Sequence, residues 1–405
     1  MIASVVCAIL TAANLPTSQA AAPSTTYGQI LIAGGSGISG TLGSVELYNP
    51  AANSFAAQGP AMTAARQFHT AAAIVSGPNT GKVLLAGGLS NKGTLASTEL
   101  YDPVSNTFAV GPDMDVARDH HTATVISSGP NAGKILLAGG ENRNTGVVSI
   151  ASTELYDPAA NKFTVGPALN DSRYAHTATA IVSGPNTGKI LLAGGFSTDG
   201  GALASTELCD PAANKCAVGP ALNAARFGHS ATAILSGSNA GKILFAGGFD
   251  GNDSIASTEI YDPAANKFAA GPTLKTARRF HTATVISTGP NAARILLAGG
   301  LNNTGPLAST EIYDPEANKF AVGPNMAFPR DHHTATVILS GPNVGKILMA
   351  GGDDTINDTK LASTELYDPA SNKFVVGRSM TVARAFDTAI QLPAARAQAK
   401  VAISP

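Results

Sequence analysis

Seven internal repeats limit what this chain can fold into more than any other feature. Gly-Gly pairs recur at positions 34/35, 87/88, 139/140, 194/195, 247/248, 299/300 and 351/352, spaced 52 to 55 residues apart. A period of this length is typical of solenoids and propellers, in which a repeat buries its apolar faces only against neighbouring repeats. The 405-residue chain is therefore expected to form one large repeat domain, although its length alone would suggest two or three domains.

Each repeat divides into four short segments with strand character, which we call a, b, c and d. In the repeat that spans 176–226 these segments read HTATAIV, KILLAGG, STELCDP and NKCAVGP. They are rich in β-branched and aliphatic residues and are bounded by Gly, Pro, Asn or Asp, which favour tight turns. Because four antiparallel strands cannot bury two apolar faces alone, each sheet must stack against the next one around a ring. The pattern predicts an all-β protein.

The repeat resembles that of the kelch family. The resemblance rests on the Gly-Gly pairs, on a Tyr after Glu in strand c and on an aromatic residue in strand d, where kelch repeats usually have Trp and this chain, which has no Trp, has Phe. The residues concerned are Tyr48, Tyr101, Tyr156, Tyr261, Tyr313 and Tyr367, with Phe55, Phe108, Phe163, Phe268, Phe320 and Phe374. The resemblance covers about residues 28–393. It implies a seven-bladed β-propeller of four-stranded blades, similar to bacterial exported kelch proteins and to the central domain of galactose oxidase.

The two ends of the repeat region complement each other. The first repeat begins at strand b, near Ile30, whereas the last segment, from Phe386 to Leu392, is a strand a without partners. The kelch resemblance implies that this C-terminal strand joins the N-terminal strands b, c and d in one blade. The expected organisation is a signal peptide over 1–22, a propeller over 27–393 and a C-terminal tail over 394–405.

The N-terminal segment has the pattern of a secretory signal peptide. An apolar stretch from Ile2 to Ala13 precedes a polar break and small residues around Ala20. A disordered Ala-rich leader is the alternative, because the segment has no Lys or Arg. The apolar stretch is shorter than the roughly 20 residues that span a bilayer, so no membrane span is expected. We expect a monomer that is secreted, periplasmic or extracellular.

One repeat has cysteine in both aromatic positions, at Cys209 and Cys216. Strands c and d are antiparallel neighbours, so these residues are predicted to face each other at the Cβ separation of about 3.8 Å that a disulfide requires. Such a bond would indicate an oxidising compartment. Two buried free thiols are the alternative.

A repeated Arg-x-x-His motif precedes strand a. A catalytic site is one set of unlike residues that converge once, so a pair found in nearly every repeat is better interpreted as part of the framework. We expect many of the arginines to pair with the strand c glutamates, because buried charges need partners. The pairs are Arg66/His69, Arg118/His121, Arg173/His176, Arg226/His229, Arg278/His281 and Arg330/His333, and the seventh copy is Arg384/Asp387.

The positions that differ between repeats predict a binding face. They are the b–c loops and the two residues inside Arg-x-x-His, which must lie on the same face of the ring. Aromatic and charged residues near the central mouth suit ligand contact. Ordinary variation of rim loops is the alternative. The candidate ligand-binding residues are Gln67, Phe68, Asp119, His120, Tyr174, Phe227, Arg279, Phe280, Asp331, His332, Phe386 and Asp387.

No catalytic residue, cofactor or metal site is predicted. Asp119-His120-His121 and Asp331-His332-His333 contain metal-ligand types, but adjacent side chains of a strand point to opposite faces and could ligate only in part. The acidic loops at Asp250–Asp253 and Asp353-Asp354 are interpreted as solvated turns. No nucleophile elbow, phosphate loop or Cys/His zinc pattern occurs.

A binding scaffold for a protein or glycan partner is the leading functional interpretation. The net charge of -1 and the absence of a Lys/Arg run argue against nucleic acid as a partner. The kelch resemblance leaves open a carbohydrate-active enzyme, similar to sialic acid epimerases or galactose oxidase, with a site at the propeller mouth; a structural surface protein is a third alternative. An enzyme should have a deep central pocket, and a binding protein a broad aromatic face.

Overall fold

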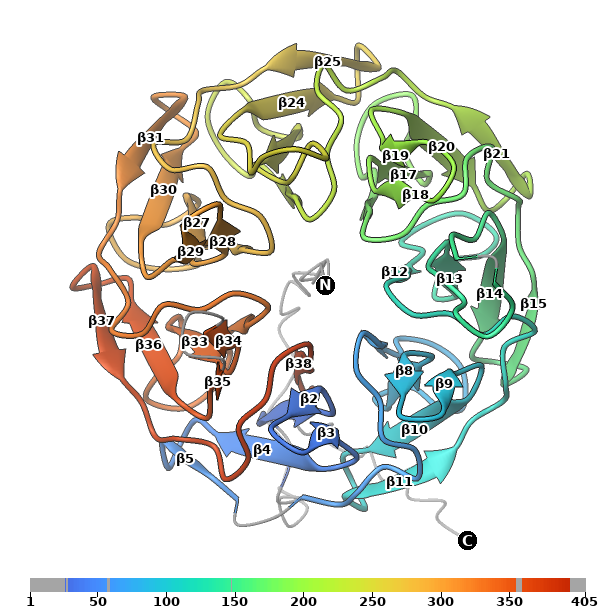
Figure 1. Cartoon of the computed structure of the whole chain (residues 1–405), viewed down its shortest axis with the longest axis horizontal. Helices are drawn as coiled ribbons and strands as arrows, with labels where there is room; N and C mark the ends of the chain where they lie inside the picture. Colours follow the sequence, from blue (N-terminus) through green and yellow to red (C-terminus); the bar gives the residue numbers. More distant parts are fainter. Residues whose placement is uncertain (1–25, 27, 57–58, 147, 355–358, 394–405) are drawn as a thin grey trace, which may run out of the picture.

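The computed structural model describes residues 26, 28–56, 59–146, 148–354 and 359–393. These residues form seven four-stranded antiparallel sheets that stand around a central axis as blades (Figure 1). The seven-bladed kelch-type propeller predicted from the repeats is thus confirmed. The predicted signal peptide and C-terminal tail lie outside the described residues. Within the described residues, no helix has the length and apolar character needed to cross a membrane.

Every blade is built from strands a, b, c and d in that spatial order, and blades are numbered here by the chain order of strand b. From blade 1 to blade 7, strands a are β38 (Thr388–Gln391), β6 (Thr70–Ala73), β12 (Thr122–Val125), β16 (Thr177–Ala180), β22 (Ser230–Ala233), β26 (Thr282–Val285) and β32 (Thr334–Val337). Strands b are β1 (Ile30–Ala33), β7 (Val83–Ala86), β13 (Ile135–Ala138), β17 (Ile190–Ala193), β23 (Ile243–Ala246), β27 (Ile295–Ala298) and β33 (Ile347–Ala350).

The outer half of each blade follows the same order. Strands c are β4 (Val45–Asn49), β10 (Thr98–Asp102), β14 (Thr153–Asp157), β20 (Thr206–Asp210), β24 (Thr258–Asp262), β30 (Thr310–Asp314) and β36 (Thr364–Asp368). Strands d are β5 (Ser54–Phe55), β11 (Thr107–Val110), β15 (Lys162–Val165), β21 (Lys215–Val218), β25 (Lys267–Ala270), β31 (Lys319–Val322) and β37 (Lys373–Val376).

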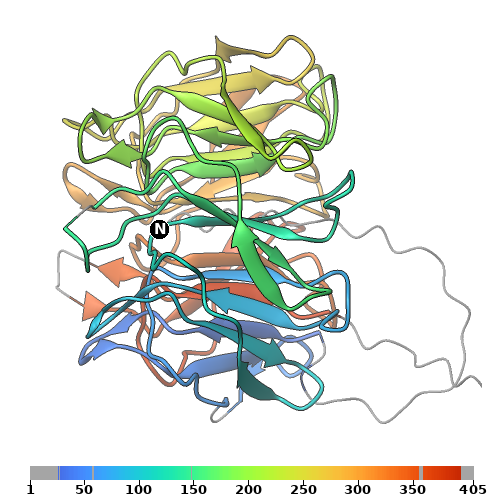
Figure 2. The same ribbon diagram turned by 90° about the vertical axis from the view of Figure 1, so that its right-hand side faces the viewer.

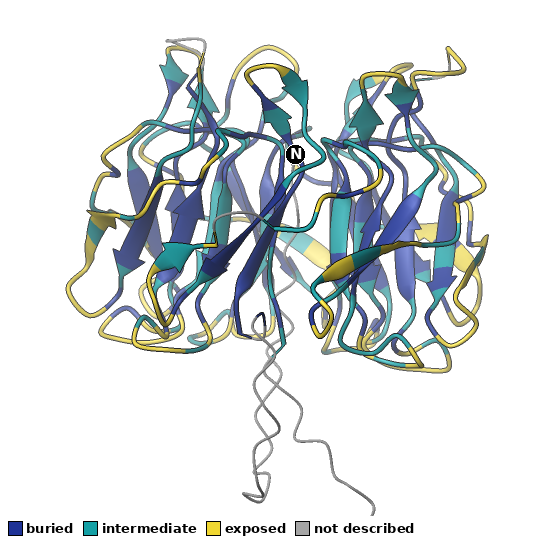
Figure 3. Ribbon diagram, turned by 90° about the horizontal axis from the view of Figure 1, so that it is seen from below, coloured by how far each residue is buried: buried dark blue, intermediate teal, exposed yellow. Residues whose placement is uncertain are grey.

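The apolar core lies between blades rather than inside any one of them. Strands b are buried along their whole length, whereas strands d at the rim are largely exposed, as the colours of Figure 3 show. Between blades 5 and 6, for example, Leu244 and Ile260 pack with Ile295, Leu297 and Tyr313. Each blade therefore depends on its neighbours, because its faces are apolar on both sides.

The aromatic pair that carries the kelch resemblance joins strands c and d. In blade 5, Tyr261 and Phe268 are directly opposite across the strands, with ring centroids 5.1 Å apart. The Tyr261 hydroxyl donates to the side chain of Asn266, which holds the left-handed φ of 50° that the c–d turn needs. The same Tyr, Phe and Asn arrangement recurs in blades 1, 2, 3, 6 and 7.

Blade 4 has a disulfide in place of this aromatic pair. Cys209 on β20 is directly opposite Cys216 on β21, and the structure joins their sulfur atoms, with Cα atoms 3.9 Å apart. The bond lies in the core between blades 3 and 4, where both cysteines are buried. It links the same two strands that the Tyr–Phe contact links in the other blades.

Blade 1 closes the ring with strands from the two ends of the chain. β1 pairs with β38 on one side and β4 on the other, with Ile30 opposite Gln391 and Ala33 opposite Thr388. The pairing extends beyond the strand, because the amide of Gly28 donates to the carbonyl of Pro393 at 3.1 Å. Closure by the C-terminal strand, as the sequence predicted, is confirmed.

Truncation after Arg384 should severely destabilise the propeller. The truncation removes β38, leaves the buried strand β1 with an unpaired edge and exposes the inner side of blade 1. We expect a much lower midpoint of urea unfolding. A truncation after Pro393 retains every described contact of β38 and serves as the control; equal midpoints for the two truncated chains would contradict this role for β38.

Seven buried Arg–Glu pairs connect each linker to the blade that follows it. In blade 5 the Arg226 guanidinium contacts Glu259 at 2.9 Å and donates to the carbonyls of Gly247 and Ser257. All seven arginine side chains are fully buried. The pairs are Arg66–Glu99, Arg118–Glu154, Arg173–Glu207, Arg226–Glu259, Arg278–Glu311, Arg330–Glu365 and Arg384–Glu46, at 2.9 to 3.3 Å. The predicted pairing of these arginines is confirmed.

Removing one partner of such a pair should destabilise the fold strongly. Arg226→Met leaves the Glu259 carboxylate buried without its counter-charge, which costs about 3–5 kcal/mol. The double variant Arg226→Met/Glu259→Leu should cost less than the sum of the single variants in urea unfolding. The partly exposed pair of Lys242 and Asp262, 3.3 Å apart, provides the control, since Lys242→Ala should cost at most about 1 kcal/mol.

Candidate functional site

The two variable regions of the sequence meet on one face of the propeller, which we call the loop face. The first variable residue inside each Arg-x-x-His motif pairs through its backbone with the residue that follows Gly-Gly in the same blade. Asp119 pairs in this way with Glu141, and Tyr174 pairs with Phe196. The opposite face carries the a–b and c–d turns (Figure 2). The predicted placement of both variable regions on one face therefore agrees with the strand connections.

Small hairpins that the sequence analysis did not predict extend five of the b–c loops. They rise above the blades on the loop face (Figure 3). The strands are β2 (Ser36–Gly37) with β3 (Gly40–Thr41), β8 (Leu89–Ser90) with β9 (Gly93–Thr94), β18 (Phe196–Ser197) with β19 (Gly201–Ala202), β28 (Leu301–Asn302) with β29 (Gly305–Pro306), and β34 (Asp353–Asp354) with β35 (Thr359–Lys360). Their strands have two residues each, too few for a period-2 pattern to be visible in sequence.

The second variable residue of each motif contributes to a closed ring of backbone hydrogen bonds around the axis, which we call the mouth ring. Its amide donates to the carbonyl of the corresponding residue in the preceding blade, at 2.8 to 3.3 Å, so that the seven bonds form a circuit. Every member has a positive φ, between 46° and 64°. The members are Phe68, His120, Ala175, Gly228, Phe280, His332 and Phe386.

Aromatic side chains of the mouth ring stack side by side across most of the mouth. His120 lies on Phe68 with centroids 3.9 Å apart, Phe68 contacts Phe386 at 4.6 Å, and Phe386 contacts His332 at 4.3 Å. Phe280 continues the row beyond His332 at 4.2 Å. All five rings are half-buried.

A second group of aromatic residues, the outer aromatic row, lies over blades 4 and 5. It consists of Tyr174, Phe196, Phe227 and Phe249, whose successive ring centroids are 5.3 to 5.5 Å apart. The Arg279 guanidinium lies 4.2 Å from the centroid of Phe249. These residues are half-buried, so the row presents apolar surface beside a cation.

Blade 3 places a charged cluster at the mouth. His120 Nδ1 lies 2.6 Å from Asp119 Oδ1 and 3.0 Å from Glu141 Oε1. Arg143 donates to Glu141, and the Thr94 hydroxyl donates to Asp119 at 3.0 Å. Burial raises the pKa of Asp119. Burial also opposes ionisation of Glu141, but hydrogen bonds from His120 and Arg143 outweigh it and lower the pKa of Glu141 to about 2.

Blade 7 carries a related cluster. His332 Nδ1 lies 2.8 Å from Asp331, which is fully buried, and Lys360 forms an ion pair with Asp353. Burial, together with the negative charge of Asp353, raises the pKa of Asp331 to about 7. Burial lowers the pKa of His332. The two clusters are chemically alike but have different cations.

The structure divides the twelve candidate residues into surface and buried groups. The side chains of Asp119, Asp331 and Asp387 are buried, with 0 to 2% exposed. The remaining nine are half-buried and lie in the mouth ring or next to it: Gln67, Phe68, His120, Tyr174, Phe227, Arg279, Phe280, His332 and Phe386. The geometry thus brings these nine to one face, but which of them contact a ligand stays a prediction.

The motif histidines belong to the framework. Each Nε2 contacts the Thr or Ser hydroxyl that begins strand a of the preceding blade; His176, for example, contacts Thr122 at 3.1 Å. Burial lowers the pKa of His176 to about 3. Equivalent bonds, at 2.9 to 3.0 Å, involve His69, His121, His229, His281 and His333. These histidines connect neighbouring blades and do not face the mouth.

Asp387 occupies the histidine position of blade 1. Its carboxyl is buried and has no hydrogen-bond partner among the described residues, and the Thr334 hydroxyl that a histidine would contact bonds instead to the Ala350 carbonyl. Burial raises the pKa of Asp387 to about 7. The residues of blade 1 that correspond to the variable pair are Ala385 and Phe386.

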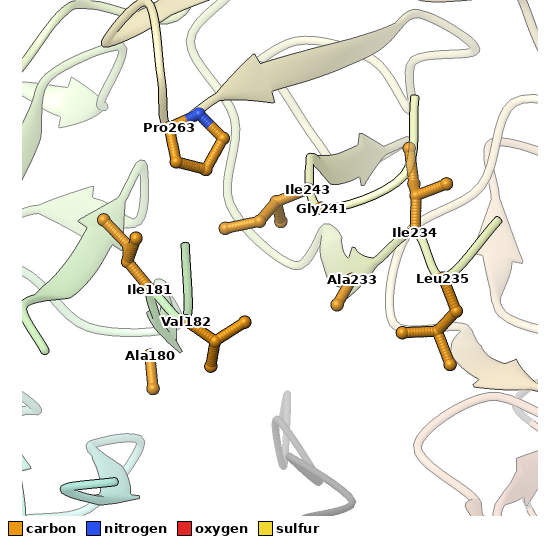
Figure 4. Close-up of a pocket in the computed structure, with 9 residues that line it drawn as sticks. All are labelled: Ala180, Ile181, Val182, Ala233, Ile234, Leu235, Gly241, Ile243 and Pro263. Carbon is orange, nitrogen blue, oxygen red and sulfur yellow. The ribbon is translucent and has the colours of Figure 1, made fainter. Parts of the chain in front are cut away.

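Two cavities lie among the described residues on the face opposite the loop face. One, of about 150 Å³, lies between blades 4 and 5 and is lined by apolar residues that include Ile181, Val182 and Leu235 (Figure 4). The other, of about 170 Å³, lies beside the turns that contain Asn131 and Pro211. Neither cavity contains a candidate binding residue.

Sequence analysis missed several residues of the loop face. Glu141, Phe196, Phe249 and Leu301 each follow a Gly-Gly pair and are brought beside the variable pair by strand pairing. The residue after Gly-Gly also differs from repeat to repeat, so sequence variation could have identified it. It was instead counted as part of the b–c loop. Arg143 could not have been assigned, since its contact depends on the path of that loop.

The repeat architecture and the comparisons with known proteins both indicate kelch repeats. The family model of the Kelch motif matches residues 235–275 and 294–327, within blades 5 and 6. The chain is a kelch-repeat β-propeller. This propeller is 26% identical to galactose oxidase of Gibberella zeae over 307 residues, which are 69% of this chain and 42% of that protein.

Other relatives are equally distant. Human Kelch-like protein 23 is 26% identical over 284 residues, 70% of this chain and 46% of its own length. Beta-scruin of Limulus polyphemus is 26% identical over 310 residues, 72% of this chain and 31% of its own length. The propeller therefore spans less than half the length of these curated relatives. The solved structure of YjhT superposes with a TM-score of 0.55 at 12% identity, over 77% of this chain and 97% of that one, which shows the fold alone.

Asp387 should make the stability of the propeller depend on pH. Its folded-state pKa of about 7 exceeds the ordinary value of 3.8, so the folded chain holds a proton that the unfolded chain releases between these values. The contribution of Asp387 to stability is therefore lost as the pH rises from about 4 to about 7.

The variant Asp387→Asn cannot titrate at this position. Its stability relative to the wild type, measured by urea unfolding at a series of pH values, should rise between pH 4 and pH 7 and then level off. A difference that is constant over this range would show that the pKa of Asp387 is the same in the folded and the unfolded chain, which contradicts the prediction.

Proposed function

We propose that this kelch propeller is a non-enzymatic binding scaffold that presents its loop face to a protein or glycan partner. The observation that carries this proposal is the outer aromatic row beside Arg279. Half-buried aromatic rings with a neighbouring guanidinium are typical of binding surfaces, where they supply apolar contact area and directional hydrogen bonds.

The aromatic side chains at the mouth support binding rather than catalysis. The rings from His120 to Phe280 contact one another in a row and present apolar surface. Kelch propellers commonly bind proteins. An enzyme of the carbohydrate-active kind stays the alternative, because galactose oxidase is among the relatives. A structural surface protein is the third alternative.

We also propose that the propeller is an exported monomer. The Cys209–Cys216 disulfide supports export, because such bonds persist in oxidising compartments. The signal-peptide pattern over 1–22 supports it as well. A partner on the loop face would then be met outside the cytoplasm.

A binding screen with matched variants tests the proposed face. The purified propeller would be applied to a glycan array and to a displayed peptide library, in parallel with Tyr174→Ala and Arg279→Ala. Losing either side chain should weaken binding of the selected ligand by about 1–3 kcal/mol, because each removes a large contact in or beside the outer aromatic row. Val104→Ala, at an exposed residue of a c–d turn on the opposite face, should bind as the wild type does.

The outcome separates the alternatives. A sugar or a peptide whose binding is lost in both variants identifies the partner class. Binding that survives both substitutions places the site elsewhere and contradicts the proposal. Conversion of a bound sugar, followed by NMR, would favour the enzyme alternative.

A further inference from the structure

We infer that Asp119, His120 and Glu141 form a binding site for a divalent transition-metal ion, with zinc the expected ion. The inference is independent of the partner proposed above. One nitrogen and two carboxylate oxygens from these residues lie within 4.8 Å of one another. The donors come from two chain segments that strand-like backbone pairing holds together, since the Asp119 and Glu141 amides each donate to the other's carbonyl at 3.0 and 2.8 Å.

The backbone at His120 explains why the donors converge. Sequence reasoning assumed extended strands, in which Asp119 and His120 would point to opposite faces. His120 has a φ of 51°, however, because it belongs to the mouth ring, and this left-handed conformation brings its Nδ1 to 2.6 Å from Asp119 Oδ1. The extended geometry assumed for this motif therefore does not apply at His120, although it stays true that only part of Asp119-His120-His121 can ligate. Only His121 is directed away, to the hydroxyl of Thr70.

The other blades show that the fold does not require this charged trio. At the position of His120 they have Phe in three blades, Ala or Gly in two, and His only in blade 7. At the position of Glu141 they have Leu in two blades and Phe in two. The same backbone thus holds apolar side chains elsewhere, so two buried carboxylates and an imidazole at this point need a separate reason.

The donor set matches a borderline metal ion. Zinc binds His nitrogen and Asp or Glu oxygen, and three protein ligands leave a coordination position open. A cation already lies at this point, because Arg143 donates to Glu141 and has its Nε 3.8 Å from Asp119. The Arg143 side chain is 46% exposed, so it can withdraw to solvent when a metal ion binds.

Few other histidines can compete for the metal. The chain has 8 histidines. Six of them bond through Nε2 within the framework, which leaves His120 and His332. In blade 7 the position of Glu141 is occupied by Asp353, whose side chain is shorter than that of Glu and forms an ion pair with Lys360. Within the described part of the chain, the donor atoms of that cluster do not form a convergent set. His332 is therefore a natural control for His120.

Calorimetric titration of the untagged, chelator-treated propeller with ZnCl₂ tests the site, with CaCl₂ and MgCl₂ as parallel titrants. We expect one zinc per chain and much weaker binding of the two hard cations. His120→Phe and Glu141→Leu use residues that other blades carry at these positions, so the fold should tolerate them. Each should weaken zinc binding by at least about 10-fold, as loss of a group that orients or forms a metal site does.

Two further variants separate a metal site from a purely structural charge cluster. Arg143→Ala removes the competing cation and should tighten zinc binding, whereas a structural cluster would lose stability with no gain in affinity. His332→Phe makes the same substitution in blade 7 and should leave zinc affinity unchanged. The proposal is overturned if the wild type binds no zinc, if His120→Phe binds as the wild type does, or if His332→Phe abolishes binding.

Discussion

The buried ion pair between each linker arginine and the strand c glutamate is the interaction on which the rest of the structure depends. In blade 5 the Glu259 carboxylate also accepts the amides of Asn223 and Ala224, so it holds the linker backbone as well as the Arg226 side chain. Burying these charges is costly, and the geometry is retained only because nearly every polar atom of the pair is bonded. The pair thereby determines where the linker enters the next blade.

The backbone position of the mouth depends on the contacts that hold each linker. Arg and His of each motif are both held, the arginine in its own blade and the histidine against the strand a hydroxyl of the preceding one. The two residues between them form the rim through backbone atoms alone. The first pairs with the residue that follows Gly-Gly, and the second joins the mouth ring. Because the backbone makes these bonds, side chains at the rim vary without loss of the ring, which allows an aromatic surface over blades 4 and 5 and a charged cluster in blade 3.

Much of the fold was predictable because it depends on local residue patterns repeated seven times. Turn residues, the Gly-Gly pairs and the Tyr–Phe positions marked each strand, and the missing strand a at the N-terminus predicted closure by Phe386–Leu392. For the candidate face, the sequence predicted which loops lie together but not which side chains contact one another. The convergence of Asp119, His120 and Glu141 was not, because it depends on a positive φ at His120 that residue type does not signal, as Phe68 and Ala175 share that conformation.

The residue pattern and the kelch resemblance that it carries were therefore enough to specify seven blades, their strand order and the closure. The Arg–Glu pairs followed from the need to pair buried charge. Tertiary structure decided which side chains meet at the mouth. Glu141 meets Asp119 across a backbone bridge, Asp387 is buried, and aromatic rings from five blades contact one another at the mouth. These contacts join residues from loops or blades far apart in the chain, and only the closed ring brings them within reach of one another.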